Sequence, residues 1–442
     1  MAAIDASQYA TITIESTVDR SKTVDLRLGV ISIDYYEDIF SPTVTAKMVV
    51  INTGNVVAGN DNDQTQSLYH GLPLRGGERV VIKIEGNSDN NPGLDFSTDP
   101  DQYMYVSSIG NVMSEGEKES FVLSLTTREA ITNETSRVGE KYPASSPLSS
   151  SAQKIITEKL FTTRNIKVDP TQNKYGFIGN MRKPFTVLTW MASKAVPDIS
   201  EEDSTAGYCF FQTATSYCFK SIDKMMKEPS KATYTYSTGA PSERGSNEDF
   251  KILSYITNKN QNLIENLRLG TYSSLRLNFN PLTFTINDPS QGLFNTQNYS
   301  GKMVSLGKDI EIPSLDGNND TSLGDLYSRI VTSILDVGTM ETGVELDATN
   351  SDPAKYQSQS IMRYNTLMTQ SLTMTVASNT NLEAGDIIEC VFPKTTIGKK
   401  REDDEEQSGL YMIKELCHHF DTEASYTSLK LVRDTFGKST TV

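Results

Sequence analysis

The nine residues LRGGERVVI, from Leu74 to Ile82, recur as LEAGDIIEC, from Leu382 to Cys390. Both stretches hold a leucine, a variable residue, a small residue, a glycine and an acid, followed by a strand-like apolar run. Glycine permits a tight turn, and the acid can accept hydrogen bonds from nearby backbone N–H groups. The residues that we expect to shape the two turns are Gly76, Gly77, Glu78, Gly385 and Asp386.

The match continues beyond the turns. Leu74 and Tyr103 are 29 positions apart, as are Leu382 and Tyr411, and YMYVSSI there meets YMIKELC. ESFVLSLTTRE then meets ASYTSLKLVRD with a drift of two or three residues. We interpret this as two copies of one barrel, the second split by an insertion, with both tyrosines as packing residues. The alternative is a chance match between two ordinary β-hairpins.

The rest of the chain suits this division. Residues 1–130 contain short alternating runs separated by Gly, Asn, Asp and Pro, which predicts a first antiparallel β-barrel. Residues 246–290 and 355–442 predict a second, discontinuous barrel, and 131–245 an α+β middle module. The predicted fold class is therefore mainly β, with two related antiparallel barrels and small α+β insertions.

Two helices are predicted in the middle module. In the first, Ser149 to Ser151 offer N-caps, and the apolar face is Ile155, Ile156 and Leu160. The second begins near Pro184, and Pro197 marks its end. Its core candidates are Phe185, Leu188, Trp190, Met191 and Ala195, and we expect Trp190 to anchor the core of this module.

A hairpin follows, YCFFQTATSYCFKSID, which contains Cys209 and Cys218. A two-residue turn at Thr213-Ala214 would place these cysteines directly opposite each other, whereas a four-residue turn would not. The chain has only four cysteines, too few for a disulfide scaffold, so we expect buried free thiols in a reducing cytosol.

The polar stretch 291–354 is predicted to be an insertion with a helix of its own, in TSLGDLYSRIVTSILDVG. Ser322 and Asp325 have capping-box spacing there. The apolar face of this helix would be Leu326, Ile330, Ile334 and Leu335. A further helix is expected at about 354–368. The acidic run 399–407 is most simply a solvated hairpin loop, with a partner contact as the alternative.

Composition excludes several classes of protein. The net charge is −15, and residues 1–130 hold 19 acidic against 9 basic side chains, so phosphate attraction does not hold nucleic acid here. No run approaches the ~18 apolar residues of a membrane span, and the first residues show no signal-peptide pattern.

The sequence also contains few motifs of the kind that enzymes and metal sites use. Phosphate-binding loops, HExxH and GxSxG motifs and zinc-type Cys/His clusters are lacking. Of the three histidines, His418 and His419 are adjacent, so on a strand they face opposite sides and cannot share a metal. We therefore predict no catalytic, metal-binding or cofactor-binding residues, and no enzyme activity.

The C-terminal third, SIMRYNTLMTQSLTMTVASNTNLEAGDIIECVFPK followed by SGLYMIKELCHHFDTEASYTSLKLVRDTFG, resembles the baseplate central hub proteins of contractile-tailed bacteriophages. The PFTVLTWMASKA helix and the hairpin ending in FKSID are also similar to that family. The resemblance implies two tail-tube-like barrels per chain and a trimeric torus with pseudo-sixfold symmetry. Such a hub joins the threefold central spike to the sixfold tail tube and leaves a channel for DNA.

The partners that the resemblance implies follow from this connecting role. They are two further copies of the chain, the spike protein, a tail tube or tube-initiator protein, baseplate wedge proteins and a tape-measure protein. DNA would touch the lumen only in transit, and no stable membrane association is implied. The implied location is the virion tail baseplate, assembled in the bacterial cytoplasm. Alternatives are a hub or spike-base part of a contractile injection or type VI-like secretion system, a receptor-binding fibre adapter, and a tail-associated cell-wall-degrading enzyme.

Overall fold

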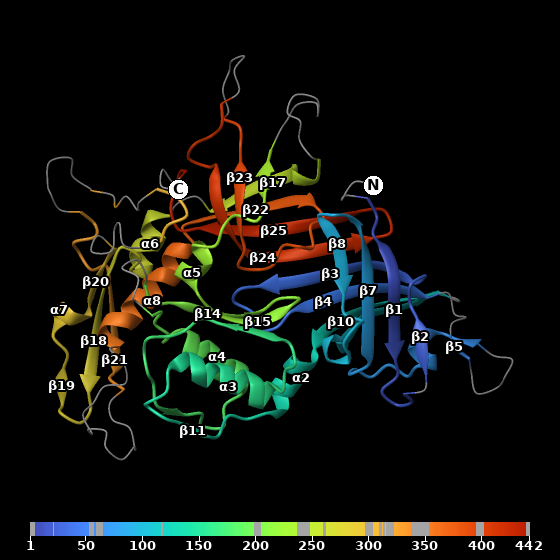
Figure 1. Ribbon diagram of the computed structural model, residues 1–442, viewed down its shortest axis with the longest axis horizontal. Coiled ribbons are helices and arrows are strands. Elements are labelled where there is room, and N and C mark those ends of the chain that lie inside the picture. The colour runs from blue at the N-terminus through green and yellow to red at the C-terminus, as the bar shows by residue number, and fades with distance from the viewer. Residues whose placement is uncertain are drawn as a thin grey trace.

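The computed structural model describes residues 5–20, 22–52, 57–58, 65–115, 118–198, 205–236, 248–259, 262–296, 304–308, 312, 314, 322–336, 353–394 and 402–438. The fold is mainly β, as predicted, and it is organised around one large, largely antiparallel sheet (Figure 1). In the described part of the chain, no helix is long and apolar enough to cross a membrane.

The large sheet has two halves. The first contains, in spatial order, β3 (Val30–Asp38), β4 (Thr45–Asn52), β10 (Lys118–Thr127), β9 (Met104–Glu115), β7 (Arg79–Ser88), β1 (Gln8–Glu15) and β2 (Thr23–Asp25). The second contains β17 (Ile252–Lys259), β22 (Gln370–Ala377), β25 (Ser425–Arg433), β24 (Gly409–Asp421), β23 (Ile387–Val391) and β16 (Thr233–Thr235). The halves join where β24 pairs with β3. A short β8 (Asn91–Asp95) pairs with β7.

Five strands thus recur in one order, β3-β4-β10-β9-β7 and β17-β22-β25-β24-β23. The pairing of the equivalent strands can be aligned as well. Leu125 of β10 pairs with Ala46 of β4 in the first half, and Leu431 of β25 pairs with Leu372 of β22 at the equivalent place in the second half. The sixth strands differ, because β1 runs antiparallel to β7 while β16 runs parallel to β23. The repeat read from the sequence is therefore present in the strand topology.

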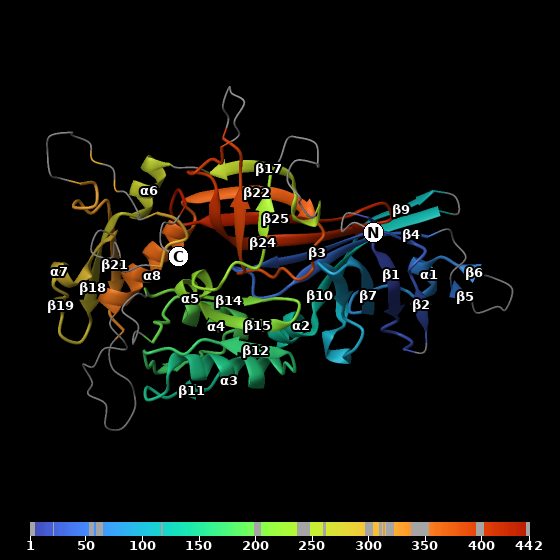
Figure 2. The ribbon, with the colours of Figure 1, turned by 45° about the horizontal axis from the view of Figure 1, so that its top comes forward.

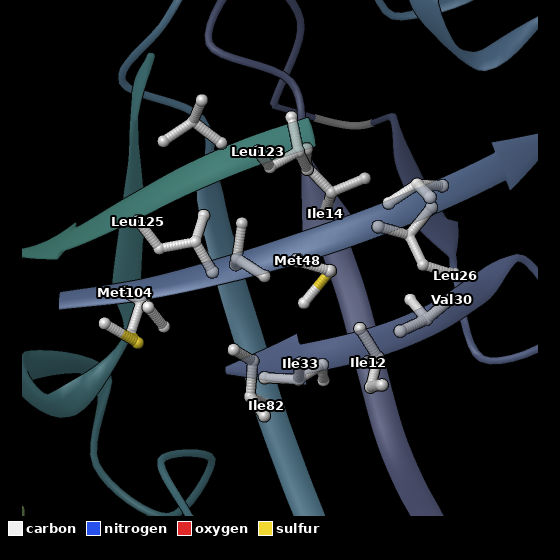
Figure 3. Packing of buried hydrophobic residues seen from close by; sticks show 14 of the residues in the cluster. Ile12, Ile14, Leu26, Val30, Ile33, Met48, Ile82, Met104, Leu123 and Leu125 are labelled. Atoms are coloured by element: carbon white, nitrogen blue, oxygen red, sulfur yellow. The ribbon is translucent and has the colours of Figure 1, made fainter. Parts of the chain in front are cut away.

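Each half has its own apolar core. In the first half, β3 and β4 lie across β1 and β7, with Ile33, Met48, Ile12 and Ile82 between them (Figure 3). The alternation of apolar and polar residues along these strands places every second side chain in this core.

The middle module packs three helices against a small sheet. The helices are α2 (Arg128–Thr135), α3 (Leu148–Leu160) and α4 (Pro184–Ala192), and the strands are β12 (Asn165–Val168), β14 (Tyr208–Gln212) and β15 (Ser216–Ser221). β11 (Lys141–Tyr142) pairs with β13 (Phe177–Ile178), and α5 (Ile222–Met226) follows the hairpin. The smaller elements elsewhere are β5 (Val57–Ala58), β6 (Thr65–Gln66), α1 (Leu68–Gly71), and 3-10 turns at Pro100–Gln102 and Glu248–Phe250.

The predicted caps of α3 are wrong. The helix begins at Leu148 with Pro147 at the N-cap, so Ser149 and Ser151 lie inside it and are buried. Ser149 Oγ instead accepts a hydrogen bond from the backbone N–H of Thr171 at 3.2 Å. A tertiary contact therefore uses the hydroxyl that would have capped the helix. The helix α4 does begin at Pro184, and its end at Ala192 precedes the predicted one.

The β14–β15 hairpin has a four-residue turn, which is the second of the two alternatives. Gln212 pairs with Tyr217, so Thr213 to Ser216 form the turn. Cys209 therefore lies opposite Lys220, and Cys218 opposite Phe211. Both thiols are free and buried.

The predicted helix at 322–335 is wrong, because Arg329–Ile334 forms strand β21, parallel to β18 (Ser273–Asn280). The Asp325 side chain does accept a hydrogen bond from the backbone N–H of Ser322 at 2.8 Å, but this contact closes a turn. The run RIVTSI also alternates and contains β-branched residues, which suit a strand beside β18.

The strand β18 belongs to a separate four-stranded sheet with β19 (Thr285–Ile286), β20 (Leu293–Asn295) and β21. β18 and β19, expected in the second barrel, thus form a sheet apart from it, in which β18 pairs with β20 and β21 of the insertion. Helices α6 (Leu263–Leu269), α7 (Pro289–Gly292) and α8 (Pro353–Leu367) flank this sheet, and α8 matches the helix expected at about 354–368 (Figure 1).

Candidate functional site

The two Gly-acid turns occupy equivalent places in the two halves. The Gly77 N–H donates to Val106 O at 2.7 Å, and the Gly385 N–H donates to Ile413 O at 2.8 Å. Both glycines have positive φ, +86° and +92°, and Gly76 has +98°. These backbone conformations favour glycine, which is the physical reason why the same residue recurs in both turns.

The acid of each turn binds backbone N–H groups three positions earlier. Glu78 Oε1 accepts from the Arg75 N–H at 2.6 Å, and Asp386 Oδ2 accepts from the Glu383 N–H at 2.7 Å. Glu78 is fully buried. Burial raises the pKa of Asp386 above its ordinary value, although Lys231 Nζ lies 2.7 Å from it.

The two tyrosines do not occupy matching positions. Tyr411 pairs with Ile388, but the residue opposite the equivalent Val80 is Met104. Tyr103 lies one position earlier, is only partly buried, and places its ring 5.6 Å from the guanidinium of Arg79. Because side chains alternate along a strand, this one-residue slip turns Tyr103 away from the core side that Tyr411 occupies.

Trp190 lies at the rim of the middle module. Its side chain is 37% exposed, and its ring makes edge contacts with Tyr175 and Phe177 at 5.6 and 5.3 Å. The deeper positions of α4 are taken by Leu188 and Met191, which are fully buried.

Glu37 is a site residue that sequence reasoning missed, and it joins three parts of the chain. From β3, its carboxyl group accepts from the Ala214 N–H at 2.6 Å in the hairpin turn. It also accepts from the Ala384 N–H at 2.9 Å in the second Gly-acid turn, and from the Tyr35 hydroxyl at 2.9 Å. Burial raises the pKa of Glu37 to about 8 despite these three donors. The alternation of β3 does hold a signal, because Glu37 lies in phase with Ile33 and Tyr35 and therefore on the buried face of the strand.

The same hairpin makes further contacts to both halves. Gln212 Oε1 accepts from the Val44 N–H at 3.2 Å in the first half. Glu383 Oε1, in the second half, accepts from the hydroxyls of Thr213 and Thr215 at 3.0 and 2.6 Å. Since every buried polar group here needs its partner, this polar junction holds the middle module against both halves in one orientation.

A second buried charge cluster lies behind the hairpin. Arg363 of α8 is fully buried and pairs with Asp223 Oδ1 at 2.6 Å and Asp434 Oδ2 at 2.9 Å. These residues come from α8, α5 and the segment after β25, so the ion pairs tie α8 to the middle module and to the end of the second half.

The adjacent histidines face opposite sides of β24. His418 is buried, and burial lowers its pKa to about 4. The ring of His419 stacks on Tyr426, and its nitrogens contact Asp34 and Asp421. Among the described residues, no group of His, Cys, Asp and Glu is arranged to hold a metal.

Comparison with protein-family models finds no match, and comparison with curated proteins finds none. Among solved structures, the chain is similar to the tail protein from Neisseria meningitidis MC58, at a TM-score of 0.56 and 11% identity, over 97% of each chain. It is also similar to the 43 kDa tail protein of prophage MuSo2 from Shewanella oneidensis, at a TM-score of 0.51 and 9% identity, over 96% of this chain and 98% of that one. The chain therefore shares the fold of these two tail proteins.

Proposed function

We propose that the chain is the structural hub subunit of a contractile phage tail baseplate. Three copies form a ring with six similar positions, which connects a threefold central spike to a sixfold tail tube. The observation that carries this proposal is the recurrence of five strands in one order within a single chain. Two similar units per chain, in three chains, provide what a threefold-to-sixfold adaptor needs.

The ring would hold the spike protein on one side and a tube or tube-initiator protein on the other. Wedge proteins and a tape-measure protein would contact it during assembly in the host cytoplasm, and the finished hub would lie in the virion. The net charge of −15 suits a channel through which DNA passes without sticking, because like charges repel over roughly one Debye length, about 8 Å. No covalent chemistry is part of this role.

The native mass of the purified chain, with negative-stain images of the same sample, tests the proposal. A trimer with a central hole and six lobes is the expected result. A stable dimer or a six-membered homo-oligomer would overturn it. If the chain alone is monomeric, the measurement is repeated with the spike protein, and a chain still monomeric there contradicts the proposal.

A further inference from the structure

The pairing that joins the two halves has a definite register. Residues Glu415–Asp421 of β24 pair antiparallel with Ser32–Asp38 of β3, and His419 lies opposite Asp34. This contact joins the second half of the chain to the first through ordinary strand pairing.

Both strands in this contact have an equivalent in the other half. The equivalent of β24 is β9, and both strands have a bulge at the same place, after Ile413 in β24 and after Val106 in β9. β9 also has a second bulge, between Gly110 and Met113, that β24 lacks. The equivalent of β3 is β17, and again both have a bulge at the same place, after Val30 and after Ile252. β17 has a further bulge after Thr257, so residues on these strands correspond through the residues that they pair with on the neighbouring strands.

The equivalent contact is not made within the chain. Among the described residues, Ile109–Glu115 of β9 pairs only with β10, and β17 pairs along its length only with β22. Figure 2 shows the β9 end of the sheet projecting on the side away from α8, while β17 lies along the outside of the second half. Each strand therefore presents an open edge, which is a template for pairing with another chain.

The residues on these edges fit each other. Met113 corresponds to His419, because they pair with the equivalent residues Ser120 and Tyr426. Ile256 corresponds to Asp34, because they pair with the equivalent residues Thr373 and Lys47. Transferring the internal register thus places Met113 opposite Ile256.

These two side chains are apolar, and they are 69% and 68% exposed. Val112 on β9 and Leu253 on β17 are 43% and 40% exposed. Pairing with a second chain would remove these apolar side chains from water, and this burial would stabilise the contact.

We propose that β9 of one copy pairs antiparallel with β17 of a second copy, with Met113 opposite the partner's Ile256, in the register that joins β24 to β3. The contact is head-to-tail, so each added copy again presents one free β9 edge and one free β17 edge until the ring closes. The number of copies in that ring rests on the proposed function, but the pairing itself does not.

Cysteine cross-linking tests the register. The double variant Met113→Cys/Ile256→Cys should form disulfide-linked dimers and larger species under mild oxidation, whereas each single variant and the wild type should not. The matched control is Val112→Cys/Ile256→Cys, whose first cysteine lies one position away on β9 and should cross-link several-fold less. Both positions of the test pair are well exposed, so the variants should fold.

The outcomes separate the two proposals. A sample with the native mass of a trimer but no Met113–Ile256 cross-link overturns the pairing and leaves the ring intact. Cross-linked chains that assemble as an open filament or a closed dimer support the pairing and overturn the ring of three. A chain that is monomeric with its spike protein and forms no cross-link overturns both.

A charge exchange gives an independent measurement. Met113→Lys/Ile256→Lys places like charges opposite each other and should weaken self-association roughly five- to tenfold. Met113→Lys/Ile256→Glu should restore it. If the two double variants associate equally well by analytical ultracentrifugation, these residues do not face each other.

Discussion

The carboxyl group of Glu37 accepts a hydrogen bond from the backbone N–H of Ala384 at 2.9 Å, across 347 positions of sequence. The same group binds the Ala214 N–H, so one buried acid fixes the first half, the second half and the hairpin turn between them. In a chain whose proposed role depends on the relative placement of its two halves, this junction decides the geometry.

Glu37 predicts a specific dependence of stability on pH. Burial raises its pKa from 4.5 to about 8, so between these values the folded chain keeps a proton that the unfolded chain has lost. Ionisation in the unfolded state therefore lowers the free energy of unfolding as pH rises from about 5 to 8. Glu37→Gln removes this dependence, but its amide cannot accept from one of the two N–H groups, which costs about 1–3 kcal/mol.

The difference in unfolding free energy between wild type and Glu37→Gln should therefore be largest near pH 5 and shrink toward pH 8, as measured by urea titration. The matched control is Glu85→Gln, an exposed acid on β7, which should show a small difference at every pH. A difference for Glu37→Gln that grows with pH would contradict a protonated, buried Glu37.

The two Gly-acid turns should respond unequally to alanine. Gly77 and Gly385 share a positive φ, but an added Cβ at Gly385 would lie 3.2 Å from Met225 Sδ and from Phe211 Cζ, whereas at Gly77 its nearest neighbour is 3.7 Å away. We expect Gly77→Ala to cost about 1–2 kcal/mol from backbone strain alone, and Gly385→Ala about 1 kcal/mol more. Equal melting temperatures for the two variants would show that the contacts around Gly385 relax freely.

Removing the buried guanidinium of Arg363 should destabilise the chain strongly. Arg363→Met leaves Asp223 and Asp434 buried without the guanidinium that pairs with both, which should cost about 3–5 kcal/mol. The exposed Arg268 on α6 supplies the control, since Arg268→Met should change the unfolding free energy by less than about 0.5 kcal/mol. Similar effects of the two substitutions in chemical denaturation would mean that the buried ion pairs are not needed.

The four thiols should react slowly in the folded chain. Cys209, Cys218 and Cys390 are buried, and burial raises the pKa of Cys218 to about 11 and that of Cys209 further. Burial also raises the pKa of the partly exposed Cys417 to about 12. A chromogenic thiol reagent at pH 8 should therefore modify few of the thiols within minutes, and all four at once in denaturant. Fewer than four reactive thiols in the denatured, unreduced chain would instead indicate a disulfide.

Sequence reasoning succeeded where a structure depends on neighbours in the chain. The turns at Gly77 and Gly385 need a particular backbone conformation, and the acid that completes each turn lies next in sequence. The start of α4 at Pro184 is local in the same sense, because the fixed φ of proline suits a first helical position. Each of these features depends on residues that lie within a few positions of one another, so residue type and spacing are enough to predict it.

Predictions failed where a distant segment decides between two local options. Ser322 and Asp325 do interact, yet the residues after them pair with β18, about 50 positions earlier, and so become a strand. Tyr103 and Tyr411 are equally spaced from their leucines, yet the strand register shifts the match by one residue. A slip of one position moves every side chain of a strand to the opposite face of the sheet, and residue spacing in the sequence does not reveal such a slip.

By itself, the sequence determined the β-rich class, the paired turns and the absence of recognisable catalytic motifs, because each depends on residue type and short spacing. Only the tertiary structure decided that β24 pairs with β3 and that Glu37 is buried among three segments. It also decided that, among the described residues, Ile109–Glu115 of β9 and the length of β17 each pair along one edge only. Pairing between strands that are hundreds of residues apart depends on which surfaces the whole fold brings together, and local sequence patterns do not predict it.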